Sequence, residues 1–491
     1  MKTLSVDVAV IGSGTAGMSA FRAARAHTKN VVLIESGPYG TTCARVGCMP
    51  SKLLIAAAEA AHRAHQAPIF GVHPGTVRID GAEVMQRVRS ERDRFVGFVI
   101  ETVEEWPAEA KLRGRARFIA PGKLRVGDDI ELDAARVVIA TGSAPFIPPR
   151  WRETLGDRLV VNDDVFDWMT LPRSVCVVGG GVIGLELAQA LHRLGVRVKV
   201  LTRKNRLGPL TDPDLAAKTV EIMSSELTVS GDADDIRVER VNANEGEGEG
   251  EGEGEQVEVK WWDGGIERCD RFEYLLVATG RRPQIDELDL AAGGIDLGVR
   301  GIPHFDRTTG QIDDTAVFIA GDVTNVHPLL HEAADDGRIA GDNAGRYPDI
   351  RMHPRRAPLA VVFTDPQLMI AGSSYRVLCK AGTEFEIGEA SFDDQGRARV
   401  MAQNRGLIHV YGAHHTAEFL GAEMIGPAAE HIGHLLSWAV QNKMTVQEML
   451  DSPFYHPVVE EGLRTALRDL NRKLKLGPPP VKRSMDCGPG A

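Results

Sequence analysis

The sequence predicts an α/β protein in which two similar strand–loop–helix units are followed by a separate α+β domain. Two observations carry this prediction. A glycine-rich loop occurs twice, each time between an apolar strand and a helix, and after residue 350 several strands precede several helices. The chain of 491 residues is too long for one ordinary core, and its apolar fraction of 43% is sufficient for several.

The composition narrows the class of protein before any motif is considered. A balance of 57 basic against 68 acidic residues gives a net charge of −11, which argues against nucleic acid as a general partner. No apolar run reaches transmembrane length, and the apolar N-terminal segment leads directly into a glycine loop, as a strand would. We therefore expect a cytoplasmic protein that binds neither a membrane nor nucleic acid.

The first unit opens with an apolar strand at residues 6–11, followed by a glycine loop and an alanine-rich helix. A second strand, residues 31–34, ends in Glu35. The loop glycines are Gly12, Gly14 and Gly17. This spacing is typical of a Rossmann-type unit, in which a dinucleotide pyrophosphate lies at the helix N-terminus.

The same pattern returns later in the chain. A strand at residues 174–178 leads into a loop, a helix at about 185–194 and a strand at 196–201. The glycines of this second loop are Gly179, Gly181 and Gly184. One such loop is weak support for a dinucleotide site, but two copies in the same setting favour two Rossmann-type units.

Two further segments resemble each other and support the duplication. Residues 137–145 read VVIATGSAP and residues 275–283 read LLVATGRRP, so that each is an apolar strand followed by Ala-Thr-Gly and a proline turn. Their glycines, Gly142 and Gly280, fall near the end of each unit and are counted here among the cofactor-binding residues.

An acidic run, NEGEGEGEGEGE at residues 244–255, lies between strand-like segments at 235–241 and 257–262. Alternating Glu and Gly buries no apolar area and repels itself, so we expect a solvated, flexible loop that enlarges a hairpin turn. Metal binding by this run is the alternative, but we expect no metal site.

The C-terminal region has expected strands followed by expected helices, a pattern typical of an α+β domain. Its expected strands are 360–363, 384–392, 406–411 and 419–425, and its expected helices are 428–442, 445–450 and 457–474. The tail from Gly477 is rich in Pro and Gly and is predicted to be disordered.

Cys43 and Cys48 form a close pair just after the first unit. Five residues of regular helix would separate them by about 7.5 Å along the axis, whereas a disulfide requires Cα atoms within about 7 Å. A bridge therefore needs a turn or a distorted first helical turn, which Gly47 and Pro50 would permit. Such a bridge would be readily reduced. Two free thiols or half of a metal site are the alternatives, although His62 and His65 are poorly placed as further ligands.

Together these features resemble the flavin-dependent pyridine nucleotide–disulfide oxidoreductases, and within that family the dihydrolipoyl dehydrogenase branch. The resemblance extends from residue 1 to about residue 474. It rests on CARVGCMPSK, similar to the family's redox motif, on TAVFIAGDV, similar to its second flavin motif, and on YHPVVEEGLR, similar to its His-Pro…Glu signature.

The resemblance implies that the first glycine loop holds the pyrophosphate of FAD and that Glu35 binds the adenosine ribose. Asp322 would contact the ribityl chain, where the alternative is a turn or helix cap. Lys52 would lie beside the isoalloxazine ring and pair with Glu186. The alternative for Glu186 is a solvated helix face, although its neighbours are apolar.

The second loop would hold the nicotinamide dinucleotide, with NAD favoured by the resemblance. The acidic residue expected after the second strand is replaced by Thr202, followed by Arg203 and Lys204. A missing carboxylate and nearby cations would suit the 2′-phosphate of NADP. The alternative is that both basic residues are solvated surface charges. NAD is therefore expected, with NADP left open.

His456 and Glu461 resemble the family's catalytic dyad, in which the imidazole takes a proton from a substrate thiol and the carboxylate orients the ring. A lone structural histidine is the alternative. In the family this pair serves the cysteines of the other subunit, so the resemblance implies a homodimer.

Two residues depart from the family's redox motif: Thr41 replaces a glycine, and Arg45 replaces an asparagine. Arg45 could stabilise a thiolate or favour an acidic substrate. The expected reaction is the oxidation of dihydrolipoamide, in which Cys43 exchanges with substrate, Cys48 lies against the flavin, and NAD accepts the hydride.

Two alternatives to this reaction remain open: an NADPH-dependent reductase of glutathione-type disulfides, and a non-catalytic redox sensor. A mercuric reductase is disfavoured because the tail contains only Cys487 rather than a cysteine pair. A 2-oxoacid dehydrogenase complex is a candidate partner. The predicted domains are FAD-binding at 1–150 and 282–350, NAD(P)-binding at 151–281, dimerisation at 351–475, and a disordered tail at 476–491.

Overall fold

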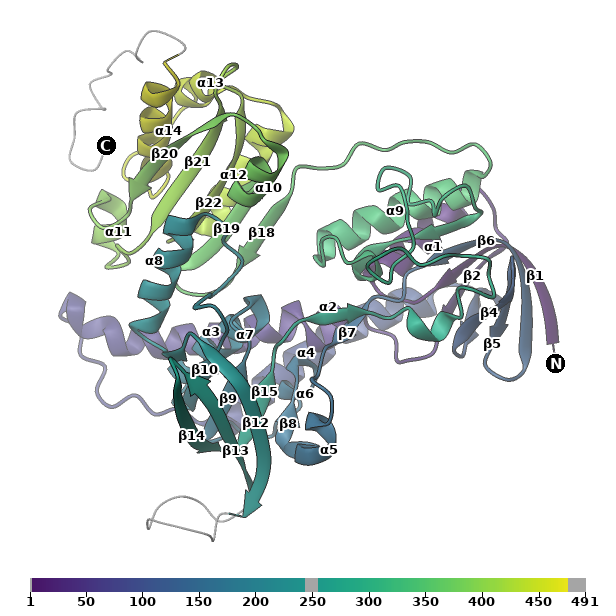
Figure 1. The fold of residues 1–491 in the computed structure, drawn as a ribbon, viewed down its shortest axis with the longest axis horizontal. Coiled ribbons are helices and arrows are strands. Elements are labelled where there is room, and N and C mark those ends of the chain that lie inside the picture. Colours follow the sequence, from purple (N-terminus) through teal and green to yellow (C-terminus); the bar gives the residue numbers. More distant parts are fainter. Residues whose placement is uncertain (1, 243–254, 476–491) are drawn as a thin grey trace.

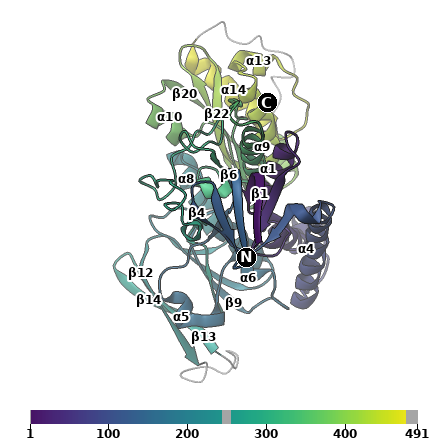
Figure 2. The same ribbon diagram turned by 90° about the vertical axis from the view of Figure 1, so that its right-hand side faces the viewer.

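The computed structural model describes residues 2–242 and 255–475, so the acidic run up to residue 254 and the tail with Cys487 lie outside the described residues. Three bodies are visible in Figure 1: the N-terminal sheet at the right, a second sheet at the lower left, and the C-terminal sheet above it. The C-terminal body and the strands β12 (Ala233–Asn242), β13 (Glu255–Asp263) and β14 (Ile266–Phe272) lie at opposite ends of the molecule in two perpendicular views (Figure 2).

The N-terminal sheet has the order β3-β2-β1-β6-β5-β4, with β17 pairing with β6. Strands β3, β2, β1, β6 and β17 are parallel, whereas β4 and β5 add an antiparallel edge. Helices α1 and α9 pack together against this sheet, where a Cβ on Gly337 would lie 2.1 Å from the carbonyl oxygen of Ala16. The bounds are β1 Lys2–Ile11, β2 Val31–Glu35, β3 Lys111–Arg113, β4 Ala116–Ala120, β5 Lys123–Val126, β6 Ile130–Ile139, β17 Val317–Ile319, α1 Thr15–Arg25 and α9 Leu330–Arg346.

The second sheet is parallel, in the order β11-β10-β9-β15-β8. An antiparallel meander, β12-β13-β14, follows it, and β12 and β13 confirm the predicted hairpin. The bounds are β8 Leu159–Val160, β9 Ser174–Val178, β10 Arg197–Leu201, β11 Thr228–Ser230, β12 Ala233–Asn242, β13 Glu255–Asp263, β14 Ile266–Phe272, β15 Tyr274–Val277, α5 Trp151–Leu155, α6 Asn162–Val165, α7 Val182–Arg193 and α8 Pro213–Ser224.

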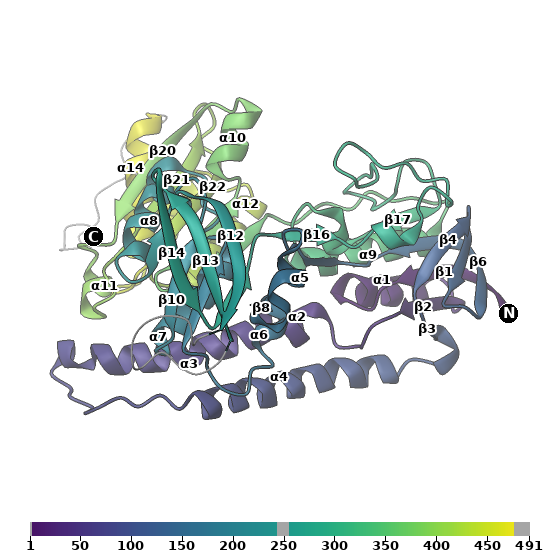
Figure 3. The ribbon, with the colours of Figure 1, turned by 60° about the horizontal axis from the view of Figure 1, so that its bottom comes forward.

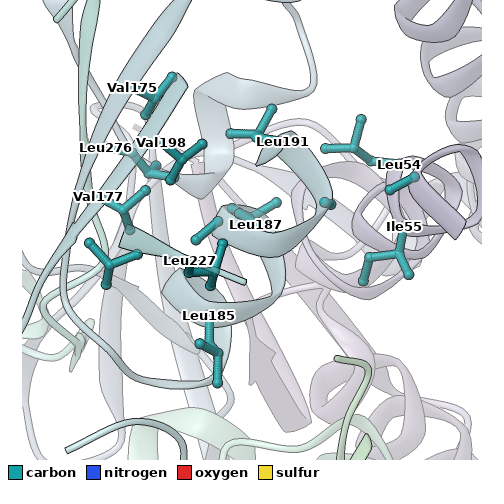
Figure 4. Packing of buried hydrophobic residues seen from close by; sticks show 14 of the residues in the cluster. Leu54, Ile55, Val175, Val177, Leu185, Leu187, Leu191, Val198, Leu227 and Leu276 are labelled. Atoms are coloured by element: carbon teal, nitrogen blue, oxygen red, sulfur yellow. The ribbon is translucent and has the colours of Figure 1, made fainter. Parts of the chain in front are cut away.

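Two long antiparallel helices, α3 (Cys48–Gln66) and α4 (Gly81–Glu104), run beneath the bodies that contain the N-terminal sheet and the second sheet (Figure 3). Helix α3 also packs against α7 of the second body. Its Leu54 is fully buried in one cluster with Leu187 and Leu191 of α7 (Figure 4). Each such side chain contributes about 1.5–3 kcal/mol of burial free energy, so the helix that begins at Cys48 is fixed against the helix that carries Glu186.

The C-terminal body is a five-stranded antiparallel sheet, in the order β18-β19-β22-β21-β20, with helices packed on it. It confirms the predicted α+β domain, although β19, α10 and α11 were not predicted from the sequence. The bounds are β18 Leu359–Val362, β19 Gln367–Gly372, β20 Phe385–Ser391, β21 Leu407–Ala413, β22 Phe419–Gly426, α10 Tyr375–Ala381, α11 Gly396–Val400, α12 Ala429–Gln441, α13 Val446–Asp451 and α14 Glu461–Leu474.

The fold class predicted from the sequence is therefore confirmed, with two Rossmann-type sheets and an α+β domain. The domain boundaries stay a prediction. In residues 2–242 and 255–475, no helix combines the length and the apolar character that spanning a membrane requires.

Candidate active site

The first glycine loop joins β1 to α1 and depends on glycine at two positions for its packing. A Cβ on Gly12 would lie 2.4 Å from the carbonyl oxygen of Ala140, and one on Gly17 would lie 1.8 Å from that of Gly12. A Cβ on Gly14 would meet nothing within 4 Å. No side chain caps the start of α1, so its first backbone N–H groups are free to bind an anion.

Glu35 lies at the end of β2, beside this loop, as predicted. Its carboxylate accepts hydrogen bonds from the backbone N–H of Ser13 at 2.8 Å, the hydroxyl of Ser13 at 2.7 Å, and the backbone N–H of Gly37 at 2.7 Å. These three bonds fix the carboxylate at the edge of the loop, where a ribose would lie. The role of Ser13 was not predicted, because the glycine spacing says nothing about the residue between the first two glycines.

Asp322 lies in a short 3₁₀ turn, Gly321–Thr324, directly after β17. The hydroxyl of Ser143 donates to Oδ2 of Asp322 at 3.0 Å. Ser143 follows Gly142, which has φ +70° and open space beside its Cα. The first Ala-Thr-Gly segment and the second flavin motif, nearly 180 residues apart, therefore meet at one point.

The two similar segments found in the sequence are also neighbours in space. Strands β7 (Ser143–Pro145) and β16 (Arg281–Pro283) pair as an antiparallel ribbon. Phe146 donates its backbone N–H to the carbonyl of Gly280 at 2.9 Å. Gly280, like Gly142, has a positive φ with open space beside it, and each glycine directly follows a threonine whose backbone N would lie 3.3 Å from a Cβ on the first glycine of the nearby loop, Gly179 or Gly12.

The second loop repeats the construction of the first. A Cβ on Gly179 would lie 2.3 Å from the carbonyl oxygen of Ala278, one on Gly184 would lie 2.0 Å from that of Gly179, and one on Gly181 would meet nothing within 4 Å. No side chain caps the start of α7. The N-terminus of α7 is therefore uncapped and has open space beside Gly181, which is the arrangement that suits an anion.

The residue after β10 differs from its counterpart in the first unit. Thr202 is buried, and its hydroxyl donates to the carbonyl of Arg206 at 2.9 Å. Arg203 and Lys204 are exposed, as is Arg206. The strand therefore ends in a hydroxyl turned back onto its own loop, where the first unit has the Glu35 carboxylate, and basic residues follow it in the sequence.

The two cysteines lie on either side of a break between helices. Helix α2 (Thr42–Val46) ends before Gly47, whose φ of −125° and ψ of −116° turn the chain, and α3 begins at Cys48. A Cβ on Gly47 would lie 3.2 Å from the Cα of Cys43. The turn inferred from the sequence is thus confirmed, and glycine at this position lets the two cysteines approach each other.

No disulfide joins the two cysteines in this structure, and their environments are not equivalent. A hydrogen bond from Cys43 lowers the pKa of Cys48 to about 7, against desolvation, with further help from the Lys52 ammonium. The same hydrogen bond, together with burial, raises the pKa of Cys43. The pair therefore holds one proton on Cys43 and favours a thiolate on Cys48.

Lys52, one turn after Cys48, forms the predicted ion pair with Glu186 of α7. Its ammonium lies 2.8 Å and 3.0 Å from the two carboxylate oxygens. Glu186 is 4% exposed and also accepts a hydrogen bond from the backbone N–H of Phe363 at 2.8 Å. The solvated-face alternative for Glu186 is wrong, because the carboxylate is buried and fully partnered.

The two departures from the family's redox motif have distinct surroundings. Thr41 has φ +54°, a conformation that suits the glycine found there in the family, and its hydroxyl accepts the backbone N–H of Ala44 at 3.2 Å. The Arg45 side chain packs beside Gly40 and acts on Asp163, whose pKa it lowers against a larger effect of burial. The cation that acts on Cys48 is Lys52.

His456 and Glu461 form a pair in the C-terminal body. Nδ1 of His456 lies 3.0 Å and 3.1 Å from the carboxylate oxygens of Glu461, which is 3% exposed. Arg464 donates to the same carboxylate at 3.1 Å, a contact that the sequence motif did not predict. The imidazole side chain is 58% exposed, and no contact among the described residues joins it to Cys43 or Cys48.

Two dinucleotide-type loops together with a close cysteine pair are the features of a dinucleotide-dependent oxidoreductase. The family model of pyridine nucleotide-disulphide oxidoreductases matches residues 6–337, and the model of that family's dimerisation domain matches residues 359–467. The chain therefore belongs to the pyridine nucleotide-disulphide oxidoreductases.

Relatives of this chain carry different enzyme names. The dihydrolipoyl dehydrogenase of Bacillus subtilis (strain 168) is 28% identical over 472 residues, covering 94% of this chain and 98% of that protein. The mercuric reductase of Streptomyces lividans is 31% identical over 470 residues, covering 94% and 95%, and that of Shigella flexneri is 31% identical over 488 residues, covering 96% and 82%. This likeness leaves the substrate open.

Solved structures show the same fold. LpdA from Mycobacterium tuberculosis superimposes with a TM-score of 0.77 at 25% identity, covering 94% of this chain and 99% of that one. The flavoprotein disulfide reductase RclA from Escherichia coli gives 0.74 at 22% identity, again covering 94% and 99%.

The residues of the first body fit FAD, which the family implies. The uncapped start of α1, the open space beside Gly14 and the fixed carboxylate of Glu35 provide for a pyrophosphate and a ribose. The family likewise implies a nicotinamide dinucleotide, for which the second loop offers the same kind of helix terminus.

Proposed function

We propose that this chain is a dihydrolipoyl dehydrogenase, which oxidises dihydrolipoamide to lipoamide through Cys43 and Cys48 and transfers the electrons to NAD. The observation that carries the proposal is the asymmetric thiol pair, with its lowered pKa at Cys48, placed beside the Lys52–Glu186 ion pair. When bound, FAD supplies the two-electron transfer between the cysteines and the nicotinamide.

In the proposed reaction, Cys43 and Cys48 have different roles. Starting from a Cys43–Cys48 disulfide, a substrate thiolate attacks Sγ of Cys43, breaks the Cys43–Cys48 bond and releases Cys48 as a thiolate, which the Lys52 ammonium stabilises. The second substrate thiol loses its proton to Nε2 of His456 and attacks the substrate sulfur of the mixed disulfide, which breaks the bond to Cys43 and releases Cys43 to take up a proton. The substrate leaves as a disulfide, and both cysteines are then reduced.

His456 is suited to this base role because Glu461 holds its Nδ1, so that Nε2 is left to accept a proton. Its exposure and its lack of contact with the cysteines of its own chain support a homodimer in which it serves the other subunit. Mixing inactive Cys43→Ser chains with inactive His456→Ala chains should then restore about half of the wild-type activity per heterodimer, since one of two sites would be intact. Subunit exchange without recovered activity would place the base elsewhere.

Steady-state assays test the reaction by measuring the specificity constants for lipoamide, glutathione disulfide and Hg(II), each with NAD(H) and with NADP(H). We expect the highest specificity constant for lipoamide. Turnover of Hg(II) or glutathione disulfide without turnover of lipoamide would refute the proposal. Fractionation of cells would test the proposed cytoplasmic location, and co-purification would test a 2-oxoacid dehydrogenase complex as partner.

A second candidate is an NADPH-dependent reductase of low-molecular-weight disulfides. The observation in its favour is the end of β10, where Thr202 replaces the ribose-binding acid and Arg203 and Lys204 are exposed. Cations without a competing carboxylate suit a 2′-phosphate. A preference for NADPH together with glutathione-type turnover would favour this candidate.

A further inference from the structure

Arg281 joins the turn that contains Asp322 to helix α2, which contains Cys43, through a continuous set of hydrogen bonds. Its Nε donates to the hydroxyl of Ser143 at 2.9 Å, and its Nη2 donates to the carbonyl of Ser143 at 2.7 Å. The Ser143 hydroxyl donates to Oδ2 of Asp322 at 3.0 Å. Since a hydroxyl has a single proton, accepting from Arg281 leaves that proton directed at Asp322.

The other edge of the same guanidinium faces α6. Nη1 of Arg281 donates to Oδ1 of Asn162 at 3.4 Å and lies 3.8 Å from Oδ1 of Asp163. Nδ2 of Asn162 donates to the carbonyl of Val46 at 3.0 Å. Val46 is the last residue of α2 and lies two positions before Cys48, so the network ends at the break that sets the cysteine pair.

Most of the network is shielded from water, with Asp163 the most exposed member at 38%. Ser143 and Asn162 are 8% and 7% exposed, and the Arg281 side chain is 16% exposed. Burial raises the pKa of Asp163, whereas Arg281 and Arg45 lower it, so the two guanidinium groups share one carboxylate. Removing Arg281 would leave buried acceptors at both ends without their donor, which is costly at such sites.

We propose that Arg281 is a positioning residue for the redox pair, holding α2 through Asn162 and Asp163 and holding Asp322 through Ser143. The role deepens the proposed function, on which it rests, because it links the thiol pair to the turn expected to bind the flavin. It acts on the geometry between Cys43 and Cys48 rather than on the substrate.

The chain provides a matched control in the next residue. Arg282 lies on the same short strand, is exposed, and places its guanidinium 4.0 Å from the ring centroid of Phe146. Arg282→Met therefore removes the same charge from the same strand without touching the network.

The test measures how fast Cys48 is alkylated by iodoacetamide as a function of pH in the reduced protein, with no substrate or nicotinamide present. In Arg281→Met and Asn162→Ala, α2 should shift and weaken the Cys43–Cys48 hydrogen bond. We expect the alkylation midpoint to rise by about half a pH unit or more, while Arg282→Met keeps the wild-type midpoint. The charge-transfer absorbance of the two-electron-reduced protein should fall in the first two variants only.

A lower thermal stability with an unchanged midpoint in Arg281→Met and Asn162→Ala would show a merely structural role and overturn the proposal. If Arg281→Met does not fold, Asn162→Ala and Arg281→Lys carry the test, because lysine keeps the charge but cannot span Ser143 and Asn162. Absence of lipoamide turnover in the wild type would refute the proposed function separately, since the alkylation profile needs no turnover.

Discussion

The two glycine loops share one backbone construction and differ at the residue that ends the following strand. A Cβ on the first glycine of each loop would strike the neighbouring parallel strand, at 2.4 Å from Ala140 for Gly12 and 2.3 Å from Ala278 for Gly179. At the strand end, Glu35 in the first unit accepts three hydrogen bonds, whereas Thr202 in the second is turned onto its own loop.

The comparison separates two requirements of a dinucleotide site. The phosphate-binding turn is dictated by packing, because helix, strand and turn approach each other so closely that only glycine fits at the first and last glycine of each loop. The ribose-binding position is set by a side chain at the edge of the sheet, which can change without any change in backbone. The fold therefore predicts that both loops bind a dinucleotide, while the identity of each dinucleotide depends on one or two side chains.

The largest effect should come from adding a methyl group at the closest contact of each loop. In Gly17→Ala and Gly184→Ala the new Cβ would lie 1.8 Å and 2.0 Å from the carbonyl of the first loop glycine. Each change should lower the free energy of unfolding by more than about 3 kcal/mol. Gly17→Ala should also lose FAD on gel filtration, whereas Gly184→Ala should retain FAD and lose nicotinamide-dependent turnover. Equal loss of FAD in both variants would show that the loops are not independent sites.

A smaller effect is expected from making the strand ends alike. Thr202→Glu would place a carboxylate where Glu35 stands in the first unit, and it should raise the ratio of specificity constants for NAD over NADP about tenfold, or about 1.4 kcal/mol. Arg203→Ala should move the ratio in the same direction. Thr202→Val, which removes only the hydroxyl, is the control. An unchanged ratio in both test variants would mean that these side chains do not face the cofactor.

Much of the site was predictable because it lies in short, contiguous motifs. The glycine loops, Glu35 and the close cysteine pair follow from local spacing, and His456 with Glu461 follows from one short segment that resembles a family motif; the structure brings each set together as expected. The Lys52–Glu186 pair, 134 residues apart, was predicted only through the family resemblance.

What the sequence did not predict depends on contacts between distant segments. The network through Ser143, Asn162, Arg281 and Asp322 contains hydrogen bonds between residues up to 179 positions apart, and no periodicity encodes such a meeting. Helix α4 was also missed, although Asp80 caps its N-terminus, because only three of its residues, Met85, Val88 and Val103, are buried and they form no continuous apolar stripe in the sequence.

A still smaller effect, on the pKa of Cys48, should follow from breaking the Lys52–Glu186 ion pair that links the two units. Because the Lys52 ammonium lowers the pKa of Cys48, Lys52→Met should raise it. In the wild type, alkylation of Cys48 should fall as the pH drops through about 7, since only the thiolate reacts. In Lys52→Met this fall should occur at higher pH, as measured by peptide mass spectrometry. Lys111→Met, which removes an amine bonded to the end of α4, is the control and should leave the midpoint in place. An unchanged midpoint in Lys52→Met would mean that the hydrogen bond from Cys43, and not the Lys52 ammonium, lowers the pKa of Cys48.

The smallest effect is expected from the acidic run, which occurs in the second unit and has no counterpart in the first. Asn242 of β12 and Glu255 of β13 are directly paired, so replacing residues 243–254 with Asn-Gly would close the two strands as a tight hairpin. Because an alternating Glu/Gly composition buries no apolar area, lipoamide turnover should stay within about threefold of the parent, and the unfolding midpoint should be unchanged or slightly higher. Turnover should be compared at two ionic strengths, since removing the acidic residues alters long-range attraction of charged ligands. A large loss of turnover with FAD still bound would show that the run takes part in the reaction, and would add a second functional difference between the two units.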